Sequence, residues 1–299
     1  MASSTELWQV GICHQPVAAC LAPAGLTHAA ITWLPNPGLF RLLADPFGLA
    51  HARGFTVLVE ALDYRIKRGE IHYYYYDHGW NLVRQGVALR APFHLSYPFL
   101  IPDGDAVYML PEAYKSGKLT LYRAAQFPDR WEPVATLLDA PAIDASVVQY
   151  QGRWWMFYAL PGPDGRALRE LHIAYADQLT GPWVPHPRNP VRMALDSSRP
   201  GGTPFVVDGA LYLPTQDCVG GYGMGVNLLR ITTLTPEDFA AEIVQRLSPQ
   251  GLHPTYTDGL HTLCSAGAVT LFDVKRTAPA PMRRWINLER RLRRLVGMG

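Results

Sequence analysis

Short runs of alternating apolar and polar residues recur along this chain at a regular interval. Each has a polar start, a short apolar strand, a turn containing Gly or Asp, and a second apolar strand. The five stretches are 44–64, 96–114, 144–162, 198–217 and 258–276. With Asp45, Tyr97, Asp144, Arg199 and His261 as equivalent starts, the spacings are 52, 47, 55 and 62 residues. A repeat of that length with several strands per unit predicts an all-β fold, a five-bladed β-propeller.

The two ends of the chain complete this organisation. The segment LWQVGIC (7–13) alternates like a strand and is expected to join the last blade as its outer strand, which would close the ring and remove an exposed edge. The propeller is therefore predicted to occupy 1–276, with TAPAP (277–281) as a linker and 282–299 as a separate helix.

Composition and charge indicate the class of protein and the cellular compartment in which it is expected. The chain has 299 residues, is 48% hydrophobic, and carries 26 Gly and 26 Pro as turn punctuation. A net charge of only +2 gives no general case for nucleic acid. The first residues lack the basic and apolar regions of a signal peptide, and four cysteines without CxxC spacing indicate reduced thiols. These features predict a cytoplasmic protein.

The repeat also predicts where a site lies. The first strand of each blade starts at the face where the antiparallel second strand ends, so residues at both positions converge around one axial opening. The second-strand ends contribute carboxylates, namely Glu60, Asp63, Glu112 and Asp217. Carboxylates crowded in a partly dry pocket push their pKa values apart, as general acid and base catalysis requires.

Such a cluster favours glycosyl cleavage or transfer. One protonated carboxyl can donate its proton to the leaving oxygen, while another acts as base or nucleophile. The candidate catalytic residues are Asp45, Glu112, Asp144 and Glu60. The candidate substrate-binding residues are Tyr97, Arg199, Asp217, His261, Asp63 and Phe47. Asp144, followed by Ala-Ser, has a purely structural alternative as a turn-capping residue.

Several longer motifs resemble a known family. ADPF in the first repeat, SYPF with LPE in the second, DAS with WWMFYA in the third and SRPGG with TQD in the fourth are similar to the N-terminal domain of plant glucosamine inositolphosphorylceramide transferases and its bacterial relatives. A more distant resemblance is to five-bladed glycoside hydrolases of families 43, 32 and 68. That resemblance implies an axial active site with Asp45 as base or nucleophile.

The chain departs from the hydrolase pattern in two repeats. Tyr97 stands where the hydrolases have an Asp, and Arg199 stands where they have a Glu. Glu112 and Glu60 are then the acid candidates from geometry alone, and Arg199 suits an anionic group on a sugar. The alternatives to an enzyme are a glycan or glycolipid recognition module, or an accessory domain to a glycosyltransferase.

Two further questions stay open in the sequence. His261 is a candidate acid–base group, a sugar hydrogen-bond partner or a buried structural histidine. No cofactor is expected, but some distant relatives hold Ca²⁺ in the axial channel, to which His261 and Asp258 are the candidate contributors. The expected partner is a sugar, a sugar nucleotide or a glycolipid.

The C-terminal segment has a helical pattern of its own. Trp285, Leu288, Leu292 and Leu295 recur at spacings of three and four, and six arginines occupy much of the remainder. Such a basic amphipathic helix could lie on an anionic membrane, dock a partner such as a membrane enzyme, or pack on its own propeller. The first alternative predicts peripheral membrane contact through 282–299.

Overall fold

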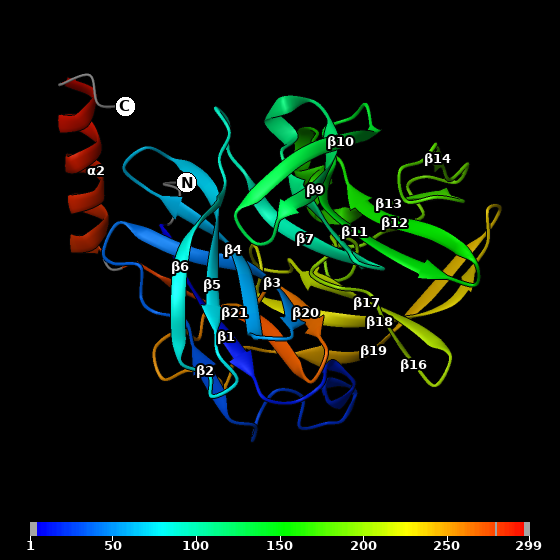
Figure 1. The fold of residues 1–299 in the computed structure, drawn as a ribbon, viewed down its shortest axis with the longest axis horizontal. Coiled ribbons are helices and arrows are strands. Elements are labelled where there is room, and N and C mark those ends of the chain that lie inside the picture. The colour runs from blue at the N-terminus through cyan, green and yellow to red at the C-terminus, as the bar shows by residue number, and fades with distance from the viewer. Residues whose placement is uncertain (1–4, 279, 296–299) are drawn as a thin grey trace.

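The computed structural model describes residues 5–278 and 280–295, and in that part of the chain five separate sheets are arranged around a common centre (Figure 1). The predicted five-bladed β-propeller is confirmed. Each blade is an antiparallel sheet whose innermost strand faces the axis, with the later strands following outward. The period-two alternation produces this arrangement, because one side of each blade must pack against the next.

The blades follow the order of the chain. The first contains β3 (Arg41–His51), β4 (Gly54–Asp63), β5 (Arg68–Tyr76) and β6 (Leu82–Leu89). The second contains β7 (Ser96–Asp103), β8 (Ala106–Glu112), β9 (Leu119–Gln126) and β10 (Arg130–Leu138). The third contains β11 (Ile143–Tyr150), β12 (Arg153–Ala159), β13 (Glu170–Ala176), β14 (Val184–Pro185) and β15 (Arg192–Met193). The fourth contains β16 (Phe205–Val207), β17 (Ala210–Asp217), β18 (Gly225–Leu234) and β19 (Phe239–Leu247).

The fifth blade joins both ends of the propeller. Its strands from the axis outward are β20 (Leu263–Ala266), β21 (Val269–Thr277), β1 (Glu6–Cys13) and β2 (Ile31–Trp33). Strand β1 pairs antiparallel with β21 from Glu6 opposite Thr277 to Cys13 opposite Thr270. The N-terminal strand thus closes the ring, but its predicted outer position is wrong. It is the third strand because β2 pairs with its other edge.

The innermost strands of the first three blades share a bulge. The register of β3, β7 and β11 against the next strand shifts at Asp45, Tyr97 and Asp144 respectively. These residues have φ angles of 50°, 46° and 49°, a left-handed conformation that is uncommon outside glycine. A bulge re-aims a side chain and interrupts pairing. The repeat thus places one unusual backbone position at the axial opening in each of the first three blades.

The remaining elements are helical. They are η1 (Val17–Leu21), η2 (Tyr114–Ser116), η3 (Pro163–Gly165), α1 (Arg166–Arg169) and α2 (Ala280–Leu295). Helix α2 lies at the periphery of the propeller (Figure 1). The linker is shorter than the predicted 277–281, because β21 continues through Thr277 and α2 starts at Ala280. Residues 296–299 of the predicted helix lie outside the described residues. None of the described helices is long and apolar enough to cross a membrane.

Candidate functional site: a buried carboxyl cluster on the propeller axis

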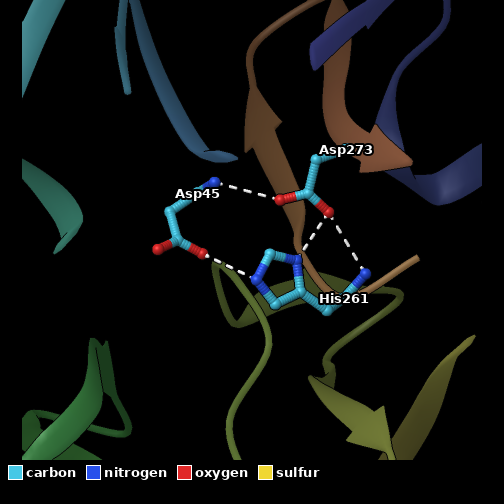
Figure 2. Close-up of side chains that lie close together, drawn as sticks. All are labelled: Asp45, His261 and Asp273. Atoms are coloured by element: carbon cyan, nitrogen blue, oxygen red, sulfur yellow. Dashed lines mark hydrogen bonds and ion pairs between the residues drawn. The ribbon is translucent and has the colours of Figure 1, made fainter. Parts of the chain in front are cut away.

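Asp45, His261 and Asp273 form a bonded group that joins the first and last blades (Figure 2). His261 Nδ1 lies 2.8 Å from Asp273 Oδ1, and His261 Nε2 lies 3.3 Å from Asp45 Oδ1. The backbone N–H of Asp45 donates to Asp273 Oδ2 over 3.0 Å. The imidazole also stacks on Trp8 with ring centroids 3.9 Å apart. This group fixes the bulged start of β3 to β21.

Burial and neighbouring charges change the ionisation of this group. Burial raises the pKa of Asp45 to about 6, although His261 opposes the rise and Asp144 and Asp273 add to it. Burial alone would lower the pKa of His261, but the carboxylates of Asp273 and Asp45 outweigh it and the net pKa is raised. The histidine is therefore favoured as an imidazolium between two carboxyl groups.

Tyr97 positions the site from the second blade. Its backbone N–H donates to Asp45 Oδ2 over 3.2 Å, and its hydroxyl lies 2.7 Å from Ser146 Oγ. The hydroxyl also accepts the backbone N–H of Gly202 over 2.6 Å. Gly202 has a φ of 140°, and a Cβ there would lie 1.8 Å from the Leu263 carbonyl oxygen, so a larger residue is excluded. Tyr97 is fully buried and links three blades, so the structure gives it a positioning role.

Asp144 is held by the fourth blade. Its Oδ2 accepts hydrogen bonds from Arg199 Nε over 2.7 Å and from Gln216 Nε2 over 2.9 Å. The guanidinium of Arg199 also lies over the ring of Tyr222, 5.2 Å from its centroid. The predicted axial arginine is therefore present, but its charge is matched by a carboxylate of the site itself.

Glu60 and Glu112 are the members of the cluster whose pKa values are raised most clearly toward the protonated form. Burial first, and then the nearby carboxyls, raises the pKa of each well above its usual range. His94 Nε2 lies 3.3 Å from Glu60 Oε1, while His94 Nδ1 accepts the backbone N–H of Gly69. Because Nδ1 accepts, the proton of the neutral ring is on Nε2, which faces the Glu60 carboxyl. Burial, reinforced by Lys115, lowers the pKa of His94 to about 4.

Three predicted residues lie away from this cluster. Asp63 pairs with Arg65 and Arg41, which hold its pKa low despite burial. Asp217 points outward and accepts the backbone N–H of Val219, because side chains alternate along β17 and its neighbour Gln216 faces inward. Phe47 is buried against Tyr97 and Phe99, so it does not offer a stacking surface at the opening.

Sequence reasoning missed several residues of the site, among them Asp273, His94 and Gln216. Asp273 was detectable, because it ends the apolar part of the second strand in the fifth repeat as Glu60 and Glu112 do in theirs. Gln216 is one residue from the predicted Asp217. His94 lies in the connection between blades, and no repeat pattern marks it.

The residues on the axis do not fit a calcium ion. Asp45, His261 and Asp273 have ligand atoms within 4.8 Å of one another. However, Asp273 already accepts the backbone N–H groups of Asp45, His261 and Thr262, and the raised pKa of His261 favours the cation. Calcium prefers six or more oxygen ligands. The other candidate, Asp258, is exposed and accepts the backbone N–H of Thr277 instead.

Calcium is accordingly expected to leave the stability unchanged. The imidazolium of His261 already provides a positive charge between Asp45 and Asp273, and binding to the folded state would otherwise raise the melting temperature. Thermal unfolding in millimolar CaCl₂ and in EDTA should give the same Tm within about 1 °C. A calcium-dependent rise of several degrees would contradict this assignment.

Glu60→Gln is expected to weaken the dependence of stability on pH. Because the folded pKa of Glu60 is raised, its contribution to stability is largest below its unfolded pKa and is lost as pH rises through the folded pKa. Glutamine cannot ionise and keeps an oxygen atom opposite His94. Urea unfolding at about pH 5 and about pH 8 should show a smaller loss in the variant than in the unmodified protein. Exposed Glu132→Gln is the control, and equal losses in all three proteins would contradict the prediction.

Solved structures of carbohydrate-active enzymes share this fold. The family 117 glycoside hydrolase Zg3597 from Zobellia galactanivorans aligns with a TM-score of 0.56 at 13% identity, covering 89% of this chain and 90% of that chain. The β-1,2-mannobiose phosphorylase from Listeria innocua aligns with a TM-score of 0.57 at 10% identity, covering 85% and 95%. These likenesses define the class by its fold, a five-bladed β-propeller that these solved carbohydrate-active enzymes share.

The sequence places the chain in a particular family within that class. The family model described as glucosamine inositolphosphorylceramide transferase 1, N-terminal, matches residues 5–250, and the chain belongs to this family. The transferase of that name from Oryza sativa subsp. indica is 38% identical over 203 residues, which cover 66% of this chain and 27% of the rice protein. The Arabidopsis thaliana protein is 32% identical over 219 residues, covering 72% and 28%. This chain thus spans about a quarter of these relatives, and the resemblance predicted from the motifs is confirmed.

Proposed function

We propose that the axial cluster binds a carbohydrate and cleaves or transfers a glycosyl unit. The observation that carries this proposal is the contrast between neighbouring carboxyl groups. Glu60 and Glu112 have pKa values raised well above the usual range, whereas Asp144 is bound to the guanidinium of Arg199. A carboxyl group with a raised pKa thus lies beside a carboxyl group that is bound to a guanidinium, and two-carboxyl glycosyl chemistry requires two carboxyl groups in different environments.

The contacts suggest a role for each group. Glu112 donates its proton to the leaving oxygen as the bond from that oxygen to the anomeric carbon breaks. Asp45 acts as the base toward an incoming water or hydroxyl, or as the nucleophile at that carbon. The N–H of Tyr97 and the hydroxyl of Thr262 hold the Asp45 carboxyl in place. Asp144 and His261 are positioning residues around these two.

The comparisons support a carbohydrate ligand more strongly than a particular reaction. The curated relatives are named glucosamine inositolphosphorylceramide transferases, and the structural neighbours include a hydrolase and a phosphorylase. Because the chain spans about a quarter of the named transferases, the activity of the whole relative is not carried over. The proposal stays at glycosyl cleavage or transfer.

A second candidate function is recognition of a glycan or glycolipid without turnover. The observation that favours it is that the carboxyl groups of the cluster are buried and already hydrogen-bonded within the protein. Asp45 is 5% exposed and Glu112 is 7% exposed, and both oxygens of Asp45 already accept hydrogen bonds. A recognition module would need the cluster only to shape its axial opening.

Crystals soaked with a panel of sugars and sugar nucleotides would test the proposal. The expected result is a sugar whose anomeric carbon lies between two carboxyl groups about 5–10 Å apart, with product formed in solution. A bound sugar with neither a flanking pair nor turnover would establish the recognition module and overturn the catalytic roles. The absence of any sugar binding would overturn both candidates.

A further inference from the structure

A basic cavity lies beside the axial cluster, between the first and second blades. It has a volume of about 500 Å³. Its walls come from the turn after β4, from the connection between β6 and β7, and from η2. The residues lining it are Ile66, Lys67, Arg68, Pro92, Phe93, His94 and Lys115. The cavity thus has three cationic side chains and no acidic one among the residues that line it.

The cationic side chains of this cavity have few carboxylate partners among the described residues. Of the four lysines in the chain, Lys118 and Lys275 pair with Asp139 and Glu6. Lys67 and Lys115 pair with no carboxylate in the described ranges. Arg68 approaches Glu70 only to 3.7 Å, and its buried Nε lacks a hydrogen-bond partner among those residues. An unmatched cluster of positive charge with an unused donor favours an anionic ligand.

His94 connects this cavity to Glu60 of the axial cluster. It lines the cavity, and its Nε2 lies 3.3 Å from Glu60 Oε1. A ligand with its anion in the cavity would be separated from Glu60 by little more than the imidazole ring. By contrast, Arg199 on the axis is bound to Asp144, so the cavity offers the less satisfied cations.

We propose that this cavity binds the phosphate group of a phosphorylated sugar or glycolipid and directs the attached sugar toward the axial cluster. The lysines supply mobile point charges and Arg68 supplies a planar donor group, a combination that suits a phosphate monoester or diester. Phe93 gives an apolar wall for the rest of the ligand. The choice of substrate class rests on the proposed function, whereas phosphate binding itself does not.

Titration of the unmodified protein by NMR, with the His94 imidazole as reporter, would test the site. The probes are glucose 1-phosphate, inorganic phosphate, glucose, and dihexanoyl phosphatidic acid as a soluble phospholipid. The two small phosphates are expected to shift the His94 signal at millimolar concentrations, and glucose alone is not. Stronger binding of the phospholipid would identify a lipid headgroup as the source of the phosphate.

Charge-removing variants make the test specific. Lys67→Gln and Lys115→Gln should each weaken glucose 1-phosphate binding about three- to tenfold, and the double variant more than tenfold. Lys118→Gln is the matched control, since this exposed lysine lies close in sequence but outside the cavity. No phosphate binding, or equal binding by the double variant, would overturn the site. Glu112→Gln should bind phosphate normally, so a failure here is distinguishable from a failure of the glycosyl proposal.

Helix α2 supports a second, independent inference. It packs inward through Ile286, which is 2% exposed. The stripe noted in the sequence faces solvent instead: Trp285, Leu288, Leu292 and Leu295 are 62%, 47%, 50% and 82% exposed. A solvent-facing stripe of four large apolar residues on one helix is unusual in a protein surface.

The charges around the stripe indicate what it contacts. Arg284 and Arg291 are exposed, and Arg293 pairs with Glu289, the only acid of the helix. Met282 of α2 and Arg41 line the same small cavity, and Arg41 pairs with Asp63 at the end of β4, which places α2 beside the turn that follows β4. That turn continues into the basic cavity at Lys67 and Arg68.

We infer that the stripe inserts into the headgroup region of an anionic membrane. Large apolar side chains flanked by arginines match the apolar and negatively charged layers of such a surface. Because α2 lies beside the turn after β4, membrane binding would bring the basic cavity close to the lipid headgroups.

Vesicle flotation of the full chain would test this inference. Binding is expected to vesicles of phosphatidylcholine with about one-third phosphatidylserine, and not to phosphatidylcholine alone. Trp285→Ser with Leu292→Ser should lower binding at least tenfold, because each removes a large inserted side chain. Exposed Met193→Ser with Val244→Ser is the matched control. The membrane inference would be overturned if the protein did not bind anionic vesicles or if the stripe variant bound them equally well. It would also be overturned if light scattering showed a dimer in which the stripe is buried.

Discussion

Asp273→Asn is expected to lower the free energy of unfolding by about 3–5 kcal/mol. Asp273 is fully buried and accepts the backbone N–H groups of Asp45, His261 and Thr262. It also faces Nδ1 of His261 at 2.8 Å. Asparagine keeps the shape but loses the charge and replaces one acceptor oxygen with a donor. Removing one partner of a buried ion pair leaves the other charge uncompensated.

Urea unfolding measures this effect directly. Exposed Asp103→Asn is the control for the same chemical change, and it should differ from the unmodified protein by less than about 0.5 kcal/mol. Combining Asp273→Asn with His261→Gln should cost less than the sum of the single changes, because the two residues contact each other. A loss below about 1 kcal/mol for Asp273→Asn would contradict the ion pair.

Glu112→Gln is expected to lower glycosyl turnover by about 10²–10⁴, since general acid catalysis contributes on that scale. Burial and the neighbouring Asp144 raise the pKa of Glu112, which is the property that the proposed proton donor needs. Glutamine has nearly the same shape and cannot transfer that proton. Turnover should be measured on the substrate found by the sugar panel, with exposed Glu132→Gln as the control.

The leaving group separates the roles of the two carboxyls. An activated aryl glycoside needs little protonation, so Glu112→Gln should recover much of its activity on that substrate. Asp45→Asn should stay inactive on both substrates, because the attack on the anomeric carbon is still missing. Full turnover in both variants would eliminate the catalytic proposal. Unchanged ligand binding with no turnover in any protein would favour the recognition module.

The alternation of apolar and polar residues predicted much of the fold, because each repeat is encoded by residues that are close together in the sequence. Alternating strands, the turns between them and the matching polar starts indicated five blades and an axial opening, and Asp45, Glu60, Glu112 and Asp144 are indeed neighbours there. The family resemblance came from the same motifs. The position of β1 was missed because the edge that it offers to β2 depends on residues 31–33, which form only a short strand.

The sequence by itself determined the blades, the ring closure through 7–13 and the gathering of acidic residues on one axis, because strand periodicity and antiparallel pairing follow from adjacent residues. Only the tertiary structure decided which groups touch. It matched Arg199 with Asp144, placed His94 against Glu60, turned Asp217 outward, and left the apolar stripe of α2 facing solvent. These outcomes depend on contacts between residues that are far apart in the chain. They also depend on which of two adjacent strand residues faces inward, as for Gln216 and Asp217. The alternation of residues within a repeat determines neither.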